Sequence, residues 1–363
     1  MNAANLTPAS IPVIDRLHRN MLDLERDPSP ASRMKTSEQV EVCRERIAAF
    51  LHADPEDIII TRNASEANNL VSSGIELKAG DEVIIYSDNH PSNNAAWYEK
   101  SKRHGFTIDV LNQLNPHPGA AYYVESFIRR MNAKTRLLAL THVTGQVGDL
   151  LPVRDLVRAA RERGVLTLVD GAQSFGVIPV DLSDMQPDFF SASAHKWACG
   201  PKGVGLLYIN RAVQSKIRPS IVSSRPGRVG ISRTLEAFGQ RDDAAIGAFG
   251  EALSLHTRIG GHAIEVRARE LAQMLMEGLK RLDGVHMWTH ASTERSAAIV
   301  SFRAGELDPT KLSGILYQNY GIVCASRSGA DRPGLRFSPH LYNSPEEVER
   351  VVSTIKDVMN AGL

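Results

Sequence analysis

Cysteine is scarce in this sequence, which contains three in 363 residues, namely Cys43, Cys199 and Cys324. Their wide separation excludes a disulfide framework and a metal site built from closely spaced cysteines. Long hydrophobic runs are also missing, since no apolar stretch approaches the roughly 20 residues of a membrane helix. The N-terminus has no basic start followed by an apolar stretch, so it does not resemble a signal peptide. We therefore expect a cytoplasmic protein without a membrane partner.

An excess of charge of either sign is also absent. The chain carries 42 lysines and arginines against 41 aspartates and glutamates, a formal net charge of +1. Without a basic tract or an acidic tail, nothing indicates binding to nucleic acid or to a membrane surface. A small molecule is therefore the expected partner. The length exceeds what one hydrophobic core usually serves, which favours two domains.

Short apolar runs alternate with amphipathic stretches through the first two thirds of the chain. The stretch 153–163 has helical spacing, with Pro152 before it and Gly164 after it as the expected start and stop. Strands are predicted at 57–61, 82–86, 137–141, 166–170, 188–192 and 204–208. Strands that alternate with helices indicate an α/β fold with a mainly parallel sheet.

The pattern changes after about residue 250. A long helical run covers 244–282, with a possible break at Gly260 and Gly261. Strands at 297–302 and 335–338 and a capped helix at 344–359 follow. We expect an N-terminal segment (1–15), a large α/β domain (16–250) and a small α+β domain (251–363). No G-x-G-x-x-G stretch follows the first strand, which disfavours a dinucleotide-dependent oxidoreductase.

Polar residues that directly follow strands are the candidates for a site, because ligands bind beyond the carboxyl ends of the strands in such sheets. Ser65 lies where a helix begins after the first strand, a place suited to a phosphate. Asp170 ends an apolar strand, and Lys196 follows another beside a histidine. Each has a plain structural alternative, namely a helix cap, a turn-capping aspartate and a solvated surface lysine.

The order and spacing of several motifs carry a more specific signal. They are NASEANN (63–69), NHPSNNAAW (89–97), HVTGQVG (142–148), VDGAQSFG (169–176), SASAHKW (191–197), FGQRD (238–242) and RFSPHLYN (336–343). In these motifs the chain resembles the class V aminotransferase family of fold-type I pyridoxal-phosphate (PLP) enzymes. That family includes cysteine desulfurases, kynureninases, isopenicillin N epimerase and C–S lyases. The resemblance implies a seven-stranded, mainly parallel sheet with a smaller C-terminal α+β domain.

The resemblance also implies a role for individual residues in binding PLP. Lys196 would form a Schiff base with the cofactor, Asp170 would pair with the pyridine nitrogen, Gln173 would reach the phenolic oxygen, and His90 would stack on the ring. The phosphate would be held by Ala64, Ser65, Ser193 and His195, and by Gly239 and Gln240 of a neighbouring subunit. Gln240 departs from the family's Gly-Thr pair at this place.

The substrate site is implied in the same way. Arg336 would bind the carboxylate of an amino acid, a task that suits the guanidinium group. Asn2 and Thr144 would lie close to the substrate. The family pattern further implies a homodimer whose active sites are shared between the subunits.

The motifs leave the reaction open. Desulfurases carry a nucleophilic cysteine on a loop before the carboxylate-binding arginine, whereas here Cys324 precedes that position and the stretch 324–334 is short. Gly145 stands where desulfurases tend to have asparagine. These departures favour a lyase, through C–S cleavage or another β-elimination, or an epimerase similar to isopenicillin N epimerase. Transamination and desulfuration are the alternatives, and a non-catalytic PLP-fold binding protein is disfavoured because Lys196 is present.

Overall fold

A computed structural model describes all residues of the chain except 225, 330 and 363. Its larger sheet has seven strands in the order β1-β7-β6-β5-β4-β2-β3. The strands are β1 (Ile58–Thr61), β2 (Glu82–Tyr86), β3 (Thr107–Leu111), β4 (Thr135–Thr141), β5 (Leu166–Asp170), β6 (Phe189–Ser193) and β7 (Gly205–Ile209). All neighbours pair in parallel except β7, which runs antiparallel to both β1 and β6. The predicted α/β fold with a mainly parallel seven-stranded sheet is confirmed.

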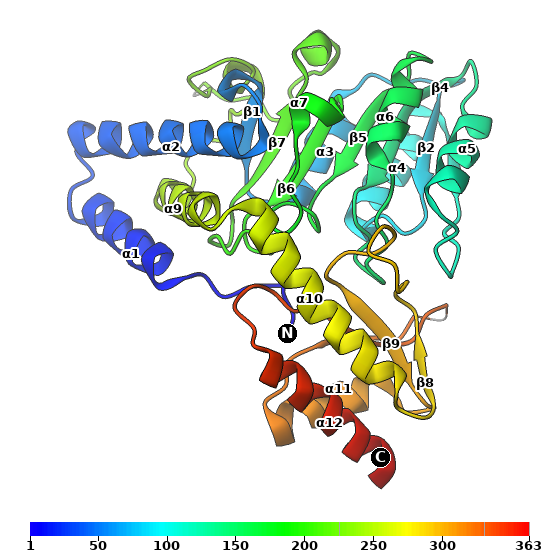
Figure 1. Ribbon diagram of the computed structural model, residues 1–363. Helices are drawn as coiled ribbons and strands as arrows, with labels where there is room; N and C mark the ends of the chain where they lie inside the picture. Colours follow the sequence, from blue (N-terminus) through cyan, green and yellow to red (C-terminus); the bar gives the residue numbers. More distant parts are fainter. Residues whose placement is uncertain (225, 330, 363) are drawn as a thin grey trace.

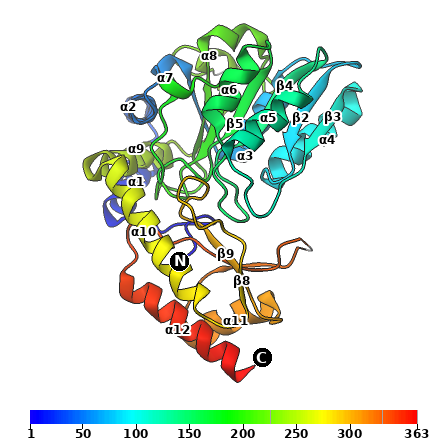
Figure 2. The same ribbon diagram turned by 45° about the vertical axis from the view of Figure 1, so that its right-hand side comes forward.

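Helices cover both faces of this sheet (Figures 1 and 2). Successive residues of one strand enter opposite cores: Ile84 packs into one apolar cluster, and its neighbours Val83 and Ile85 pack into another. Burial on both faces explains why these strands are continuous apolar runs in the sequence. The covering elements are α2 (Pro30–Leu51), α3 (Ala64–Gly74), α4 (Pro91–His104), α5 (Ala120–Arg130), α6 (Val153–Arg161), α7 (Leu182–Met185), η2 (Arg211–Lys216), α8 (Ser232–Leu235) and α9 (Asp243–Ile259).

A second, smaller layer forms around an antiparallel sheet in the order β10-β11-β9-β8. Its strands are β8 (Val285–Met287), β9 (Val300–Ala304), β10 (Ala325–Arg327) and β11 (Gly334–Phe337), and its helices are α10 (Gly261–Lys280), α11 (Pro309–Tyr320) and α12 (Pro345–Ala361). Helix α12 begins with a capping box between Ser344 and Glu347, as the sequence predicts. These elements share a third apolar core and form the small α+β part of the molecule.

Gly260 separates α9 from α10, with φ +93° at the end of one helix and the start of the next. The break predicted inside the long helical run therefore occurs there. The boundary expected between residues 250 and 251 lies within α9, which packs against α1 (Ile11–Arg26) and α2 of the large domain. We propose Gly260 as the domain boundary, because the helix that carries the small domain begins with the next residue.

The N-terminal segment lies between the two domains. Asn2 pairs with Ser338 as a short parallel bridge beyond β11, and the Thr7 backbone N–H donates to the His195 carbonyl over 3.0 Å. Ala3 and Ala4 are almost fully buried. The first residues of the chain are therefore built into the interior, where the strands of the large sheet end. No helix in the described part of the chain is long and apolar enough to cross a membrane.

Candidate active site

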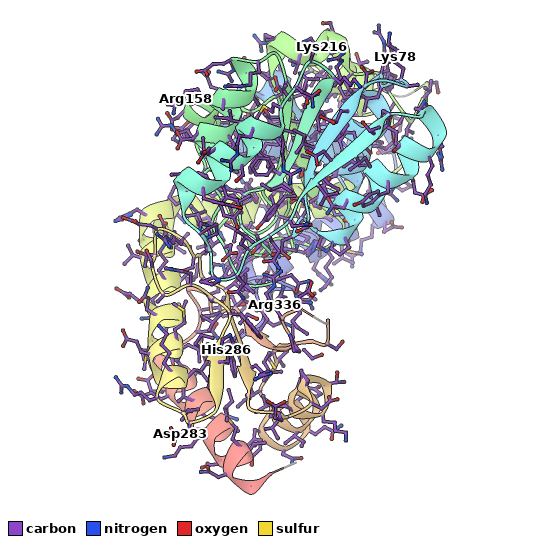
Figure 3. All side chains as sticks on the ribbon, turned by 90° about the vertical axis from the view of Figure 1, so that its right-hand side faces the viewer. Lys78, Arg158, Lys216, Asp283, His286 and Arg336 are labelled. Atoms are coloured by element: carbon purple, nitrogen blue, oxygen red, sulfur yellow. The ribbon has the colours of Figure 1, made fainter. Side chains whose placement is uncertain are left out.

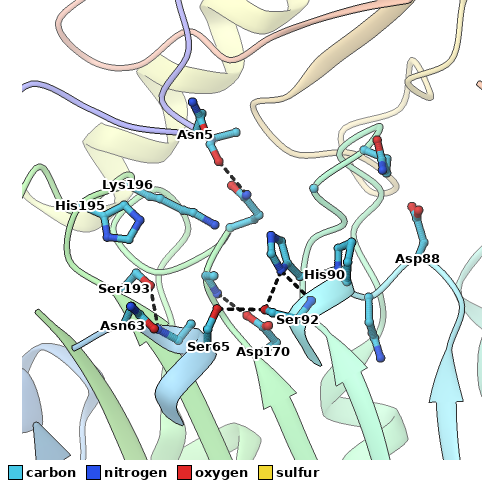
Figure 4. A pocket seen from close by; sticks show the side chains of 18 of the residues that line it. Asn5, Asn63, Ser65, Asp88, His90, Ser92, Asp170, Ser193, His195 and Lys196 are labelled. Atoms are coloured by element: carbon cyan, nitrogen blue, oxygen red, sulfur yellow. Dashed lines mark hydrogen bonds between the residues drawn. The ribbon is translucent and has the colours of Figure 1, made fainter. Parts of the chain in front are cut away.

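A pocket of about 390 Å³ opens where the strands of the large sheet end and the small domain begins (Figure 4). Nine predicted site residues line it, namely Ala64, Ser65, His90, Asp170, Gln173, Ser193, His195, Lys196 and Arg336. Others that were not predicted join them, among them Asn5, Asp88, Asn89, Ser92, Gln146 and Arg327. The fold thus brings most of the candidates, which are far apart in sequence, into one cavity.

The start of α3 forms one wall of this pocket. Asn63 caps the helix by accepting a hydrogen bond from the Glu66 N–H over 2.9 Å, and the Ala64 N–H donates to Ser193 Oγ over 2.9 Å. The helix start can approach β7 closely because residue 205 is glycine, where an added Cβ would lie 2.6 Å from Asn63 Cα. Free N–H groups and hydroxyls at a helix N-terminus suit a phosphate.

Asp170 ends β5 beneath the pocket and is 3% exposed. Its Oδ2 accepts from Asn68 Nδ2 over 2.9 Å, and its Oδ1 accepts from the Ala172 N–H over 3.0 Å. Asn68 in turn accepts from the Ser191 hydroxyl over 2.6 Å, which fixes the orientation of its amide. Two donors thus hold the carboxylate in place, and a carboxylate at this position suits the N–H of a pyridine ring.

Asn68 was not predicted, although the sequence contains a signal for it. It lies on the stripe of α3 that carries the buried Ala64, Ala67 and Val71, so a polar residue occupies an otherwise apolar helix face. Buried amides need partners. A search for polar residues on apolar stripes would therefore have identified it.

His90 caps α4 and lines the pocket opposite Asp170 and Lys196. Its Nδ1 accepts from the Ser92 N–H over 3.3 Å and lies 2.8 Å from Ser92 Oγ, which contacts Ser65 Oγ at 2.9 Å. Burial lowers the pKa of the imidazole, and the charge of Lys196 lowers it further. A neutral ring is thus held in place by the chain of hydroxyls that also contacts the helix start.

The Lys196 side chain extends into the pocket from the turn after β6 (Figure 4). Burial lowers the pKa of its amine to about 8; nearby Asp170 opposes this shift, whereas Arg336 and Arg327 reinforce it. An amine with a lowered pKa is more often unprotonated at neutral pH, which makes it a better nucleophile and base. The structural alternative of a solvated surface lysine is therefore wrong for this residue.

Two arginines enter the pocket from the small domain, and Figure 3 shows Arg336 between the two domains. Arg336 donates to the Gly145 carbonyl over 2.6 Å. Burial lowers the pKa of Arg336 to about 9, and the charge of Arg327 lowers it further. Within the described residues neither guanidinium forms an ion pair with a carboxylate, and the Nε of each has no hydrogen-bond partner. Two such cations side by side favour a bound anion.

Arg327 was not predicted because its position depends on strand pairing. Strand β10 pairs with β11 so that Ala325 lies opposite Arg336, and Arg327 lies two residues further along the same face. The sequence did not indicate a strand at β10. Without that register, the second arginine could not be assigned to the pocket.

Four predicted residues do not line this pocket. Asn2 contributes the backbone bridge to Ser338, and it is Ala4 and Asn5 that reach the cavity instead. Thr144 is fully buried, with its Oγ1 accepting from the Asp149 N–H over 2.9 Å. Neither residue is therefore in the pocket lining, although the Thr144 side chain contacts Asp88, which is. The remaining two, Gly239 and Gln240, line a separate surface cleft with Glu236 and Arg241.

The cysteines are all outside the pocket lining. Cys43 and Cys199 are buried, and Cys324 is partly buried against the small-domain core just before β10. Burial raises the pKa of the Cys43 and Cys324 thiols to about 12 and that of Cys199 to about 11. Since the thiolate is the reactive form, none of the three is suited to act as a nucleophile.

The site combines a helix start with hydroxyls, a buried carboxylate and a lysine amine of lowered pKa. These three groups fit, respectively, the phosphate, the ring nitrogen and the aldehyde of pyridoxal phosphate. The aminotransferase class V family model matches residues 6–351, so the chain belongs to that family. The protein is accordingly a PLP-dependent enzyme.

Relatives along the whole chain have different activities. Isopenicillin N epimerase from Amycolatopsis lactamdurans is 30% identical, and the match covers 99% of this chain and 94% of that protein. A probable cysteine desulfurase from Methanothermobacter thermautotrophicus is 26% identical, with coverage of 100% and 95%. The solved structure of the cystine C–S lyase C-DES with cysteine persulfide has a TM-score of 0.90 at 25% identity, with coverage of 98% and 96%.

The buried amine makes the stability of the cofactor-free protein depend on pH. The amine has a pKa of about 8 in the folded chain and about 10.4 when unfolded. The unfolded chain therefore holds more protons between these values, so Lys196 contributes a rise in unfolding free energy as pH increases across this window. Lys196→Met should lose that rise, measured by urea unfolding at about pH 7.5 and pH 9.5. An identical pH slope in both proteins, with exposed Lys311→Met as control, would contradict the lowered pKa.

Proposed function

We propose that this enzyme is a lyase that removes a group from the β-carbon of an amino acid, with Lys196 as the cofactor-binding lysine and the base. The observation that carries the proposal is a lysine amine of lowered pKa in a pocket that has no thiol in its lining. Two guanidinium groups also line it, and their Nε atoms have no hydrogen-bond partner among the described residues. Elimination needs one base and a leaving group. The pocket offers the base and an anion site.

The residues that would hold PLP are Lys196 at the aldehyde, Asp170 at the ring nitrogen and His90 on the ring face. Ser65, Ser193, His195 and the start of α3 would hold the phosphate. Gln173 would lie beside the phenolic oxygen, and its amide is already oriented by Trp197 Nε1 and the Ala4 carbonyl, both at 2.9 Å. Bound PLP supplies an electron-withdrawing ring that stabilises negative charge developing at the α-carbon.

The protein side chains bind the substrate and transfer the proton. Arg336 binds the α-carboxylate and orients the α-C–H bond toward Lys196. Released from the cofactor by the substrate's own amino group, the Lys196 amine would take the α-proton, which its lowered pKa allows near neutral pH. Arg327, beside Arg336, adds positive charge that favours an anionic substrate.

Sulfur transfer through a protein persulfide is disfavoured. That reaction needs a thiolate that reaches the substrate, whereas no cysteine lines the pocket and burial raises the pKa of all three thiols. Cys324, the cysteine nearest in sequence to Arg336, packs into the small-domain core. These observations support elimination rather than desulfuration through this chain.

Epimerisation is the second candidate. It is supported by the 30% identity to isopenicillin N epimerase, which extends over 99% of the chain. The reaction would need a second proton donor on the face of the α-carbon away from Lys196. His90 lines the same pocket and is oriented through Ser92. It would be the donor in that case.

A second copy of the chain would complete the site. Gly239 and Gln240 line a surface cleft of their own, and the family pattern assigns this segment to the neighbouring subunit's phosphate site. Several apolar side chains on α1 and α2 are exposed, including Ile11 at 73% and Met34 at 59%. Exposed apolar residues of this kind are frequent at interfaces. Both features support a homodimer with shared active sites.

The reaction is tested by incubating the holoenzyme with a panel of L-amino acids that carry β-leaving groups. We expect pyruvate or another oxo acid and ammonia, with release of the leaving group, as measured by coupled assays and mass spectrometry. Racemisation followed by chiral chromatography would instead establish the epimerase. A cysteine-dependent persulfide on the protein would contradict the lyase proposal, as would transfer of the amino group to an oxo acid.

The carboxylate role of Arg336 is tested by Arg336→Leu. Loss of a charged hydrogen-bonding partner should raise KM by about 10-fold to 100-fold. The exposed Arg281→Leu variant is the matched control and should keep the KM of the wild type. An unchanged KM in Arg336→Leu would contradict this role and would favour Arg327 as the carboxylate-binding residue.

A further inference from the structure

The peptide carbonyl that follows Lys196 is held by two buried histidines. His340 Nε2 lies 2.6 Å from the Trp197 oxygen, and His256 Nε2 lies 3.0 Å from the same atom. His256 comes from α9 of the large domain, and His340 follows β11 of the small domain. Both residues are almost fully buried. Elements from the two domains thus meet at the residue next to the lysine.

The hydrogen-bond geometry identifies His340 as the defined donor. A carbonyl oxygen only accepts, so the Nε2 that faces Trp197 must carry the proton. His340 Nδ1 has no hydrogen-bond partner in the described part of the chain, which leaves Nε2–H as the tautomer that fits. In His256, Nδ1 faces the Ala252 carbonyl and Nε2 faces the Trp197 carbonyl. A neutral ring carries one proton and can donate to only one of these two oxygens. Burial lowers the pKa of His340 to about 4 and also lowers that of His256, so both rings are neutral near pH 7.

A metal ion is the competing interpretation of this cluster. Ligand atoms of Cys199, His256 and His340 all lie within 4.8 Å of one another. However, Cys199 Sγ is 3.7 Å from the Trp197 oxygen, the same atom that both imidazoles contact. The groups therefore converge on a backbone oxygen that already occupies the space between them. This arrangement is a set of donors around a carbonyl.

The rest of the lysine turn is fixed in a similar way. Thr7 Oγ1 donates to the Lys196 carbonyl over 2.6 Å, and the Cys199 N–H donates to it over 2.9 Å. The Trp197 indole donates to Gln173. Every carbonyl from residue 195 to residue 197 therefore accepts a hydrogen bond from outside its own peptide.

His340 also lies close in sequence to the substrate-binding end of β11. Arg336 is in that strand, and only Phe337, Ser338 and Pro339 separate it from His340. Ser338 is bonded to the N-terminal segment, whose Thr7 holds the lysine turn. One short stretch of the small domain therefore connects the anion-binding arginine with the backbone beside Lys196.

We propose that His340 is a positioning residue: its imidazole N–H holds the Trp197 carbonyl and so fixes the Lys196 amine relative to the carboxylate bound at Arg336. The inference rests on the proposed function of Lys196 and Arg336. His340 would thus act on the reaction without lying in the pocket lining. His256 supports the same carbonyl from the other domain.

The test compares His340→Phe with His340→Gln in the full-length holoenzyme. Phenylalanine keeps an aromatic ring against Trp197 but removes the donor, whereas glutamine restores an N–H at a similar reach. We expect kcat to fall about 10-fold or more in His340→Phe with little change in KM, because a misplaced reacting group lowers turnover steeply. His340→Gln should recover most of the loss. Exposed His262→Phe is the control for removing a histidine.

Readouts other than turnover separate positioning from general destabilisation. In the cofactor-free protein, amide hydrogen exchange in a peptide that covers residues 195–199 should be faster in His340→Phe and close to normal in His340→Gln. The pH midpoint of the visible absorbance of the holoenzyme should shift in His340→Phe. A double variant with His256→Phe should lose less than the two single effects combined, since both rings act on one oxygen.

Several outcomes would overturn the proposal. Wild-type kcat and exchange in His340→Phe would remove the positioning role while leaving Lys196 and Arg336 in place. The positioning role would also be contradicted if His340→Gln had the low kcat of His340→Phe. Additive losses of kcat in the double variant with His256→Phe would contradict it as well. A stoichiometric metal in the purified protein, lost in His340→Phe and required for activity, would establish the metal site instead. Wild-type holoenzyme without visible absorbance would refute the proposed function itself.

Discussion

The structure depends on the burial of one amine. Lys196 loses hydration in a pocket where two guanidinium groups also lie, and desolvation lowers its pKa to about 8. Asp170 is the opposing charge, and hydrogen bonds from Asn68 and Ala172 hold its carboxylate in place. A lysine in water would be protonated and a poor nucleophile at neutral pH. The pocket between the two domains therefore creates the chemistry that the side chain would lack on the surface.

The same constraint explains why the lysine is held through its backbone. The amine has to remain free, so its position is fixed by bonds to the flanking carbonyls from Thr7, His256 and His340. These three residues belong to the N-terminal segment, the large domain and the small domain. Packing the two domains together is thus part of building the site. Arg336 and His340 lie on one stretch of chain, so the carboxylate site that we propose at Arg336 is connected to the backbone beside Lys196.

Much of this arrangement could be predicted from the sequence, because the parallel sheet places strand ends together. Asp170 and Ser193 end neighbouring strands, and Ser65 opens the helix after a third, so their meeting follows from local patterns. Arg327 could not be predicted, since it depends on pairing between β10 and β11. Thr144 lies outside the pocket lining, and its motif position does not show that its hydroxyl accepts from the Asp149 N–H. His340 lies in the RFSPHLYN motif, but its meeting with His256 could not be predicted, because it joins residues from two domains.

The central claim is that Lys196 is the residue that carries the cofactor, and chemical trapping tests it most directly. The holoenzyme is reduced with borohydride, which makes a lysine–pyridoxal linkage stable, and then digested and mapped by mass spectrometry. We expect one pyridoxyl-labelled peptide per chain, modified at Lys196. A label at Lys202 or at another lysine, or a chain that binds pyridoxal phosphate without any trapped lysine, would contradict it.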